Sequence, residues 1–207
     1  MRVWFFLSAG LALMCMAQNA AAGTVLIVGD SISAGFGLDT RLGWVSLLEQ
    51  RLKREGFDDK VVNASISGDT SAGGRARLPA LLAEHKPALV ILELGATMGC
   101  AECCQHNCNK NLASMIDSSR ASGAKVLLLG MQLPPNYGVR YTQAFAEAYT
   151  KVADEKKRSR WCRFFLDGVG GHPDLMQGDG LHPAAAAQDK LLEKCLADTE
   201  TAALTLF

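Results

Sequence analysis

Residues 24–31 read TVLIVGDS, a short apolar run followed by Gly29, Asp30 and Ser31. A run of this kind, rich in β-branched residues, is typical of a strand buried on both faces, as in parallel sheets covered by helices. In such sheets the turn at the carboxyl end of a strand faces the crevice that binds ligands. The stretch therefore predicts an α/β fold that places Ser31 at the ligand-binding edge.

The same pattern recurs along the chain. Short apolar runs predict strands over residues 24–28, 60–63, 88–94, 125–129 and 164–166. Helical spacing predicts helices over residues 44–54, 71–85, 111–121, 141–155 and 184–197, the last beginning after Pro183. Five alternations of strand and helix indicate a parallel sheet with helices on both faces.

The length and charge of the chain limit its class. It has 207 residues, with 21 Lys+Arg against 21 Asp+Glu and a formal net charge of +0. That length suits one compact domain. Because binding to nucleic acid or to an anionic membrane depends on clustered Lys and Arg, we expect neither partner. We expect instead a monomer that acts on a small molecule.

The N-terminus has the pattern of a secretory signal peptide. Arg2 precedes an apolar run over residues 3–16, and residues 20–22 are alanines of the kind that signal peptidase reads. We expect residues 1–22 to be removed and residues 23–207 to form a single domain. The apolar run is too short to span a bilayer comfortably, which argues against a stable membrane anchor. The expected location is the periplasm or the medium. The alternative interpretation of these N-terminal residues is a helix buried in the fold.

A nucleophilic serine needs a base, and DGLHP at residues 179–183 offers one. In a turn, Asp179 can accept a hydrogen bond from one ring nitrogen of His182 and leave the other nitrogen for the Ser31 hydroxyl. Each residue also has a structural interpretation, Ser31 as a helix N-cap and Asp179 as a turn cap. His172, in an ordinary loop, is the competing base.

A third candidate follows the strand expected at residues 60–63. Gly68 can bring its backbone N–H close to a bound carbonyl oxygen, and Asp69 or Thr70 can cap the next helix. The G-x-S-x-G elbow, the phosphate-binding P-loop and the dinucleotide glycine fingerprint are absent from the sequence. The pattern therefore favours acyl chemistry over phosphate or NAD binding.

Together these segments resemble the SGNH (GDSL) hydrolase family, and within it the bacterial periplasmic group described as thioesterase, lysophospholipase or arylesterase. The resemblance is carried by GDSISAGFGL (29–38), VVNASISGDTSAGGRARLPALLAEHKP (61–87), ELG (93–95), QLPPNYGVRY (132–141) and DGLHP (179–183). It implies a flavodoxin-like three-layer α/β/α sandwich with a five-stranded parallel sheet, and neither metal nor cofactor.

The resemblance also implies roles for particular residues. Ser31 would be the nucleophile, His182 the general base and then acid, and Asp179 its orienting carboxylate. The backbone N–H groups of Ser31 and Gly68 would hold the oxyanion. The implied activity is that of a serine esterase, hydrolysing aryl and acyl esters, acyl thioesters or lysophospholipids through an acyl-enzyme; a carbohydrate acetyl-esterase on the same fold is the alternative.

One segment departs from the family pattern. The family has a G-x-N-D block whose Asn donates to the oxyanion, but Thr97 stands in the Asn position here and Met98 in the Asp position. We expect the Thr97 hydroxyl to be the third donor, although its side chain is shorter. Loss of one such donor typically lowers turnover by about 10²- to 10³-fold.

The residues after Thr97 are unusually rich in cysteine. Residues 97–112 read TMGCAECCQHNCNKNL, so an impaired enzyme that binds metal through Cys100, Cys103, Cys104, His106 and Cys108 is another alternative, although the spacing is irregular. We favour a compensated pair of frame shifts, because one nucleotide string encodes the family-like NDGLRGMLPAQLQQNL in one frame and this segment in another. Residues 158–163, RSRWCR, interrupt the expected fifth strand and suggest the same origin.

Overall fold

The computed structural model describes residues 22–95, 104–132, 138–156 and 160–197. Its centre is one sheet of five parallel strands in the order β2-β1-β3-β4-β5. The strands are β1 (Thr24–Gly29), β2 (Lys60–Asn63), β3 (Leu89–Glu93), β4 (Lys125–Leu129) and β5 (Arg160–Cys162). β1 lies at the switch point of the strand order, where doubly wound sheets bind ligands.

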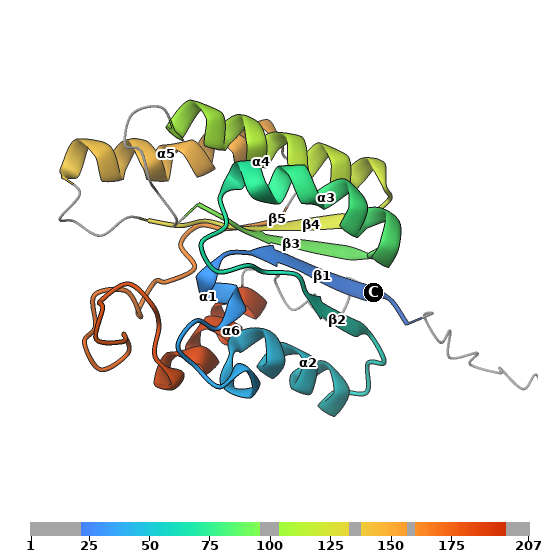
Figure 1. The fold of residues 1–207 in the computed structure, drawn as a ribbon, viewed down its shortest axis with the longest axis horizontal. Coiled ribbons are helices and arrows are strands. Elements are labelled where there is room, and N and C mark those ends of the chain that lie inside the picture. The colour runs from blue at the N-terminus through green and yellow to red at the C-terminus, as the bar shows by residue number, and fades with distance from the viewer. Residues whose placement is uncertain (1–21, 96–103, 133–137, 157–159, 198–207) are drawn as a thin grey trace, which may run out of the picture.

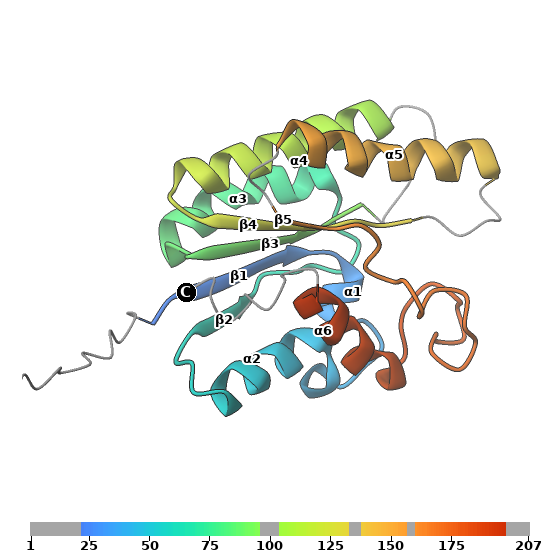
Figure 2. The ribbon, with the colours of Figure 1, turned by 180° about the vertical axis from the view of Figure 1, so that it is seen from behind.

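Helices cover both faces of the sheet (Figures 1 and 2). One layer holds α3 (Ser71–His85), α4 (Cys104–Ala121) and α5 (Val139–Glu155). The opposite layer holds α1 (Ser31–Ala34), α2 (Trp44–Arg54) and α6 (Gln188–Ala197). Two short 3₁₀ helices, Thr40–Leu42 and Ala185–Ala187, precede α2 and α6. The predicted α/β/α sandwich with a five-stranded parallel sheet is confirmed.

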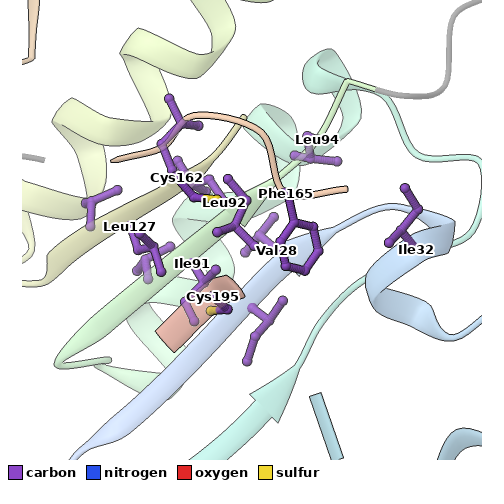
Figure 3. Close-up of a cluster of buried hydrophobic side chains, with 14 of the residues drawn as sticks. Val28, Ile32, Ile91, Leu92, Leu94, Leu127, Cys162, Phe165 and Cys195 are labelled. Carbon is purple, nitrogen blue, oxygen red and sulfur yellow. The ribbon is translucent and has the colours of Figure 1, made fainter. Parts of the chain in front are cut away.

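The core explains the apolar runs of the sequence. Every residue of β3 is buried, and in β1 only Thr24 is partly exposed. Figure 3 shows Val28, Ile91 and Cys195 in one cluster, with side chains from β1, β3 and α6. Central strands covered by helices have no polar face, which is why these runs lack the alternation of a half-exposed strand.

The prediction of a fifth strand over residues 164–166 is wrong. β5 lies just before it, and Trp161 and Cys162 pair with Leu128 and Leu129 of β4. Cys162 is fully buried, so part of the segment suspected of a frame shift supplies the edge strand. Phe165 is also fully buried, but it lies in a turn. Phe165 is apolar because it packs into the core from a loop. In the sequence, a short apolar run of this kind looks the same as a buried strand.

The remaining elements differ from prediction mainly at their ends. Helix α4 begins at Cys104 and not at residue 111, because its polar first half lacks the apolar spacing by which a helix is recognised. The helix expected over 184–197 is divided into the second 3₁₀ helix and α6. No helix among the described residues is long and apolar enough to cross a membrane.

Candidate active site

Ser31 lies directly beyond the carboxyl end of β1, as the first residue of α1. The cap of this short helix is Asp30, whose side chain accepts a hydrogen bond from the backbone N–H of Ile32 at 3.1 Å. Because Asp30 provides the cap, the alternative interpretation of Ser31 as the N-cap is wrong. The Ser31 hydroxyl is thus available for another partner.

That partner is His182, which lies 151 positions later in the chain. Its Nε2 is 2.8 Å from the Ser31 Oγ, and its Nδ1 is 2.7 Å from the Asp179 Oδ2. The structure therefore joins the three residues in one continuous chain of hydrogen bonds and does not bring His172, in an exposed loop, to the serine. An alcohol, an imidazole and a carboxylate in this order can activate the alcohol as a nucleophile.

Asp179 serves both the turn and the histidine. Its Oδ1 accepts hydrogen bonds from the backbone N–H groups of Leu181 at 2.9 Å and His182 at 3.0 Å, so it also caps the turn as the structural interpretation supposed. The hydrogen bond from the His182 side chain, followed by these backbone hydrogen bonds, holds the pKa of Asp179 well below its usual range. The carboxylate stays ionised and can stabilise a positive imidazolium.

Gly68 lies in the loop between β2 and α3 with φ +82, a left-handed conformation that favours glycine. The loop is tied to β1, because the Ile66 N–H donates to the Gly29 carbonyl at 3.1 Å and the Asp69 N–H closes the turn onto Ile66 at 3.0 Å. Among the described residues, neither the Ser31 nor the Gly68 N–H has a hydrogen-bond acceptor. Within the described part of the chain, no group therefore competes with a ligand oxygen for either donor.

Arg77 of α3 holds this loop in place, a function that its position in a helical pattern did not reveal. Its Nε donates to the Asp69 Oδ2 at 2.8 Å, and its two terminal nitrogens reach the carbonyls of Ala64 and Gly29. The planar guanidinium has enough donors to serve all three acceptors at once. Arg77 thus fixes the Gly68 loop relative to the end of β1.

Glu93, the last residue of β3, is a second residue that the sequence reasoning missed. Its side chain is fully buried, and Oε2 accepts hydrogen bonds from the Ser33 hydroxyl at 2.6 Å and from the backbone N–H groups of Ser33 at 3.3 Å and Asp30 at 3.4 Å. Burial, and next the charge of Asp30, raise the pKa of Glu93 well above its usual range. The signal in the sequence was a charged residue within an apolar run.

This carboxyl gives a testable pH dependence of stability. Above the ordinary glutamate pKa of about 4.3, the unfolded chain loses a proton that the folded chain retains, so stability falls by up to about 1.4 kcal/mol per pH unit until the raised pKa is passed. The Glu93→Gln substitution should remove this slope because the amide does not titrate. Urea unfolding from pH 5 to pH 8 measures it, with Glu49→Gln, an exposed glutamate paired with Lys53, as the control. Equal slopes in Glu93→Gln and the unmodified chain would contradict the prediction.

The other predicted site residues lie partly outside the described structure. Thr97, Cys100 and Cys103 fall outside the described residues, and the side chains of Cys104 and His106 are not described. Cys108 is described and lies buried in the core, on α4. Within the described ranges, no three His, Cys, Asp or Glu side chains are grouped so as to hold a metal ion.

Comparison with known proteins places the chain among hydrolases. Residues 27–190 match the model of the GDSL-like lipase/acylhydrolase family. The chain is 61% identical over 187 residues to the esterase TesA of Pseudomonas aeruginosa strain PAO1, covering 90% of this chain and 92% of the relative. It is 42% identical over 171 residues to thioesterase 1/protease 1/lysophospholipase L1 of Escherichia coli strain K12, covering 83% and 80%.

Comparison of the three-dimensional structures leads to the same group of proteins. A crystal structure of TesA superimposes with a TM-score of 0.82 at 59% identity, covering 86% of this chain and 98% of that one. The resemblance that the sequence motifs carried is therefore confirmed. The chain belongs to the GDSL-like lipase/acylhydrolase family.

Proposed function

We propose that this protein is a serine esterase in which Ser31 is the nucleophile, His182 the general base and acid, and Asp179 the residue that orients His182. The observation that carries the proposal is the hydrogen-bonded chain from Ser31 Oγ to His182 Nε2 at 2.8 Å and from His182 Nδ1 to Asp179 Oδ2 at 2.7 Å. Both distances lie within the range needed for proton transfer.

The reaction proceeds in two halves. The Ser31 oxygen attacks the carbonyl carbon of an ester or thioester while its proton passes to His182, and the ionised Asp179 stabilises the resulting imidazolium. His182 then gives the proton to the departing alcohol or thiol, leaving an acyl-serine. Water attacks this acyl group with His182 again as base, and Ser31 leaves with the proton. The His182 side chain is 20% exposed, which lets water reach it.

The oxyanion of each tetrahedral intermediate needs donors that are in place before the reaction. We assign this role to the backbone N–H groups of Ser31 and Gly68 and, as a third donor, to the Thr97 hydroxyl. The unpartnered state of the first two among the described residues supports the assignment. The ties of the Gly68 loop to β1 and to Arg77 support it further, because preorganised donors stabilise developing charge most effectively.

Exposed apolar side chains near these residues favour an acyl or aryl group as substrate. Phe36, Ile66 and Leu181 are each about half exposed. The centroid of the Phe36 ring lies 4.5 Å from that of the His182 ring. Leu181 precedes His182 in the sequence, and Ile66 lies in the same loop as Gly68. We infer that the substrates are aryl and acyl esters, with acyl thioesters or lysophospholipids also hydrolysed, as the names of the relatives suggest.

We further propose that residues 1–22 are removed as a signal peptide, so that a single domain of residues 23–207 acts in the periplasm or the medium as a monomer. The charged Arg2, the apolar run and the alanines at 20–22 support removal. A small ester or thioester is the only partner that this reaction requires, with no metal or cofactor.

Hydrolysis of p-nitrophenyl esters from acetate to palmitate, and of an acyl thioester, tests the proposal. We expect turnover of the esters and irreversible inactivation by a phosphonate ester, with mass spectrometry locating the adduct on Ser31. The chain-length profile separates the candidates, because a carbohydrate acetyl-esterase would accept only acetate in this series. Absence of both hydrolysis and labelling in folded protein would contradict the proposed function.

A further inference from the structure

The segment that carries Asp179 and His182 folds as a short hairpin. The Ala184 N–H donates to the Leu175 carbonyl at 2.8 Å, and the Gln177 N–H donates to the His182 carbonyl at 2.7 Å. The backbone of His182 is therefore held directly by Gln177.

The side chain of Gln177 reaches beyond the hairpin. Its Nε2 donates to the carbonyl of Pro183 at 3.1 Å and to the carbonyl of Phe36 at 2.7 Å. Phe36 is 141 positions away in sequence and belongs to the loop that follows α1, the helix of Ser31. An amide nitrogen has two hydrogens, so this one side chain can serve both carbonyls. Gln177 thus connects the loop that follows the serine helix with the hairpin of the histidine.

Two further contacts show how closely the loops are fitted here. The Phe36 ring packs against the His182 ring, with centroids 4.5 Å apart and an interplanar angle of 37°. A Cβ atom at Gly37 would lie only 2.2 Å from the Gln177 Oε1, so a larger residue would displace the amide. The hydrogen bond to the Phe36 carbonyl therefore also holds the ring that packs on the imidazole.

We propose that Gln177 is a positioning residue for the esterase reaction, setting the approach of His182 to Ser31 by joining the histidine hairpin to the loop that follows α1. The inference rests on the proposed roles of Ser31 and His182. Their 2.8 Å contact joins two segments 151 positions apart in sequence, and proton transfer tolerates little change in this distance. A misplacement of about 1 Å in a reacting group can lower the rate by about 100-fold.

The test compares Gln177→Ala and Gln177→Glu with the unmodified chain at pH 8. The glutamate has nearly the shape of glutamine, but its carboxylate has no hydrogen to donate and would face two carbonyl oxygens. We expect kcat for p-nitrophenyl acetate to fall by about 10-fold or more in both variants, with KM changed by less than about threefold. The rate of Ser31 phosphonylation should fall with kcat, since it depends on the same base.

Gln188→Ala is the matched control. Gln188 also bridges distant segments, accepting from the Trp44 N–H at 2.9 Å and donating to the Ala184 carbonyl at 3.2 Å, at the base of the hairpin. Neither of these hydrogen bonds involves Gln177, Phe36 or His182. We expect a lower Tm with kcat within about threefold of the unmodified chain, since a lost buried hydrogen bond affects stability. The Tm of every variant is measured, and the rates are compared below all melting transitions.

The outcomes are distinct. If either Gln177 variant is folded and keeps kcat and the phosphonylation rate within about twofold, the inference is overturned. Equal losses of kcat in Gln188→Ala would also overturn it, because structural weakening alone would then explain the effect. Should Gln177→Ala fail to fold, the near-isosteric Gln177→Glu decides the question. Failure of the proposed function appears differently, as an unmodified chain that neither hydrolyses esters nor reacts with phosphonate.

Discussion

The Ser31→Ala variant is expected to hydrolyse p-nitrophenyl esters with a kcat at least about 10⁴-fold lower than that of the unmodified chain. The substitution removes the oxygen that forms the acyl-enzyme, and the remaining oxyanion donors can supply only about 10³- to 10⁴-fold acceleration over water. Fold and stability should change little, because the position is the first residue of a short helix whose cap is Asp30. Initial rates at saturating substrate, together with a thermal melt, measure both effects.

Ser46→Ala is the control for this substitution. Ser46 lies on α2, where its hydroxyl donates to the Thr40 carbonyl at 2.7 Å and not to any of the proposed catalytic residues. Its kcat should stay within about twofold of the unmodified chain, as is usual for a surface substitution. A Ser31→Ala variant that retained a tenth or more of the activity would show that another group is the nucleophile.

The second large effect is expected for Asp179→Asn, with kcat lower by about 10⁴-fold. The asparagine amide cannot balance the charge of an imidazolium. It also favours the wrong tautomer of His182, because an amide N–H directed at Nδ1 moves the ring proton to Nε2 and leaves no acceptor for the Ser31 hydroxyl. The same rate assay measures the loss, and phosphonylation of Ser31 should slow in parallel.

Asp167→Asn is the matched control for the carboxylate. Asp167 pairs with Lys194 at 3.0 Å, and its side chain is 63% exposed. Exposed ion pairs contribute at most about 1 kcal/mol to stability, so this variant should keep both its activity and most of its stability. If Asp179→Asn and Asp167→Asn had similar rates, an orienting role for Asp179 would be ruled out.

Much of the fold could be predicted from the sequence because the central strands are buried on both faces. Residues 24–28, 88–94 and 125–129 were expected as strands, and the structure has β1, β3 and β4 there. The edge strand β5 was misplaced, since it has only three residues, Arg160–Cys162, and is followed by Arg163, while the more apolar Phe165 and Leu166 pack in a turn. For so short a strand, pairing with the neighbouring strand decides where it lies, and local hydrophobicity does not reveal the pairing.

Some residues of the candidate site could likewise be predicted from the sequence, and others could not. Ser31 stood out because a turn at the end of a buried strand faces the ligand crevice, and Asp179 and His182 because their spacing lets one turn hold both. Arg77 and Gln177 gave no such signal, and the charge of Glu93 within an apolar run did not reveal its partners. Each acts through partners distant in sequence: Glu93 through Ser33, Arg77 through Ala64 and Gly29, and Gln177 through Phe36.

Local order along the chain was therefore enough to predict the α/β class, the family and the candidate residues Ser31, Asp179 and His182, because burial periodicity and short-range spacing are properties of neighbouring residues. Tertiary structure alone decided that Asp30 caps the serine helix, that the buried Glu93 carboxyl accepts hydrogen bonds from that helix, and that Gln177 reaches the Phe36 carbonyl. These contacts depend on the order β2-β1-β3-β4-β5 and on how the loops pack at its carboxyl edge. Both arise only when distant segments share one core.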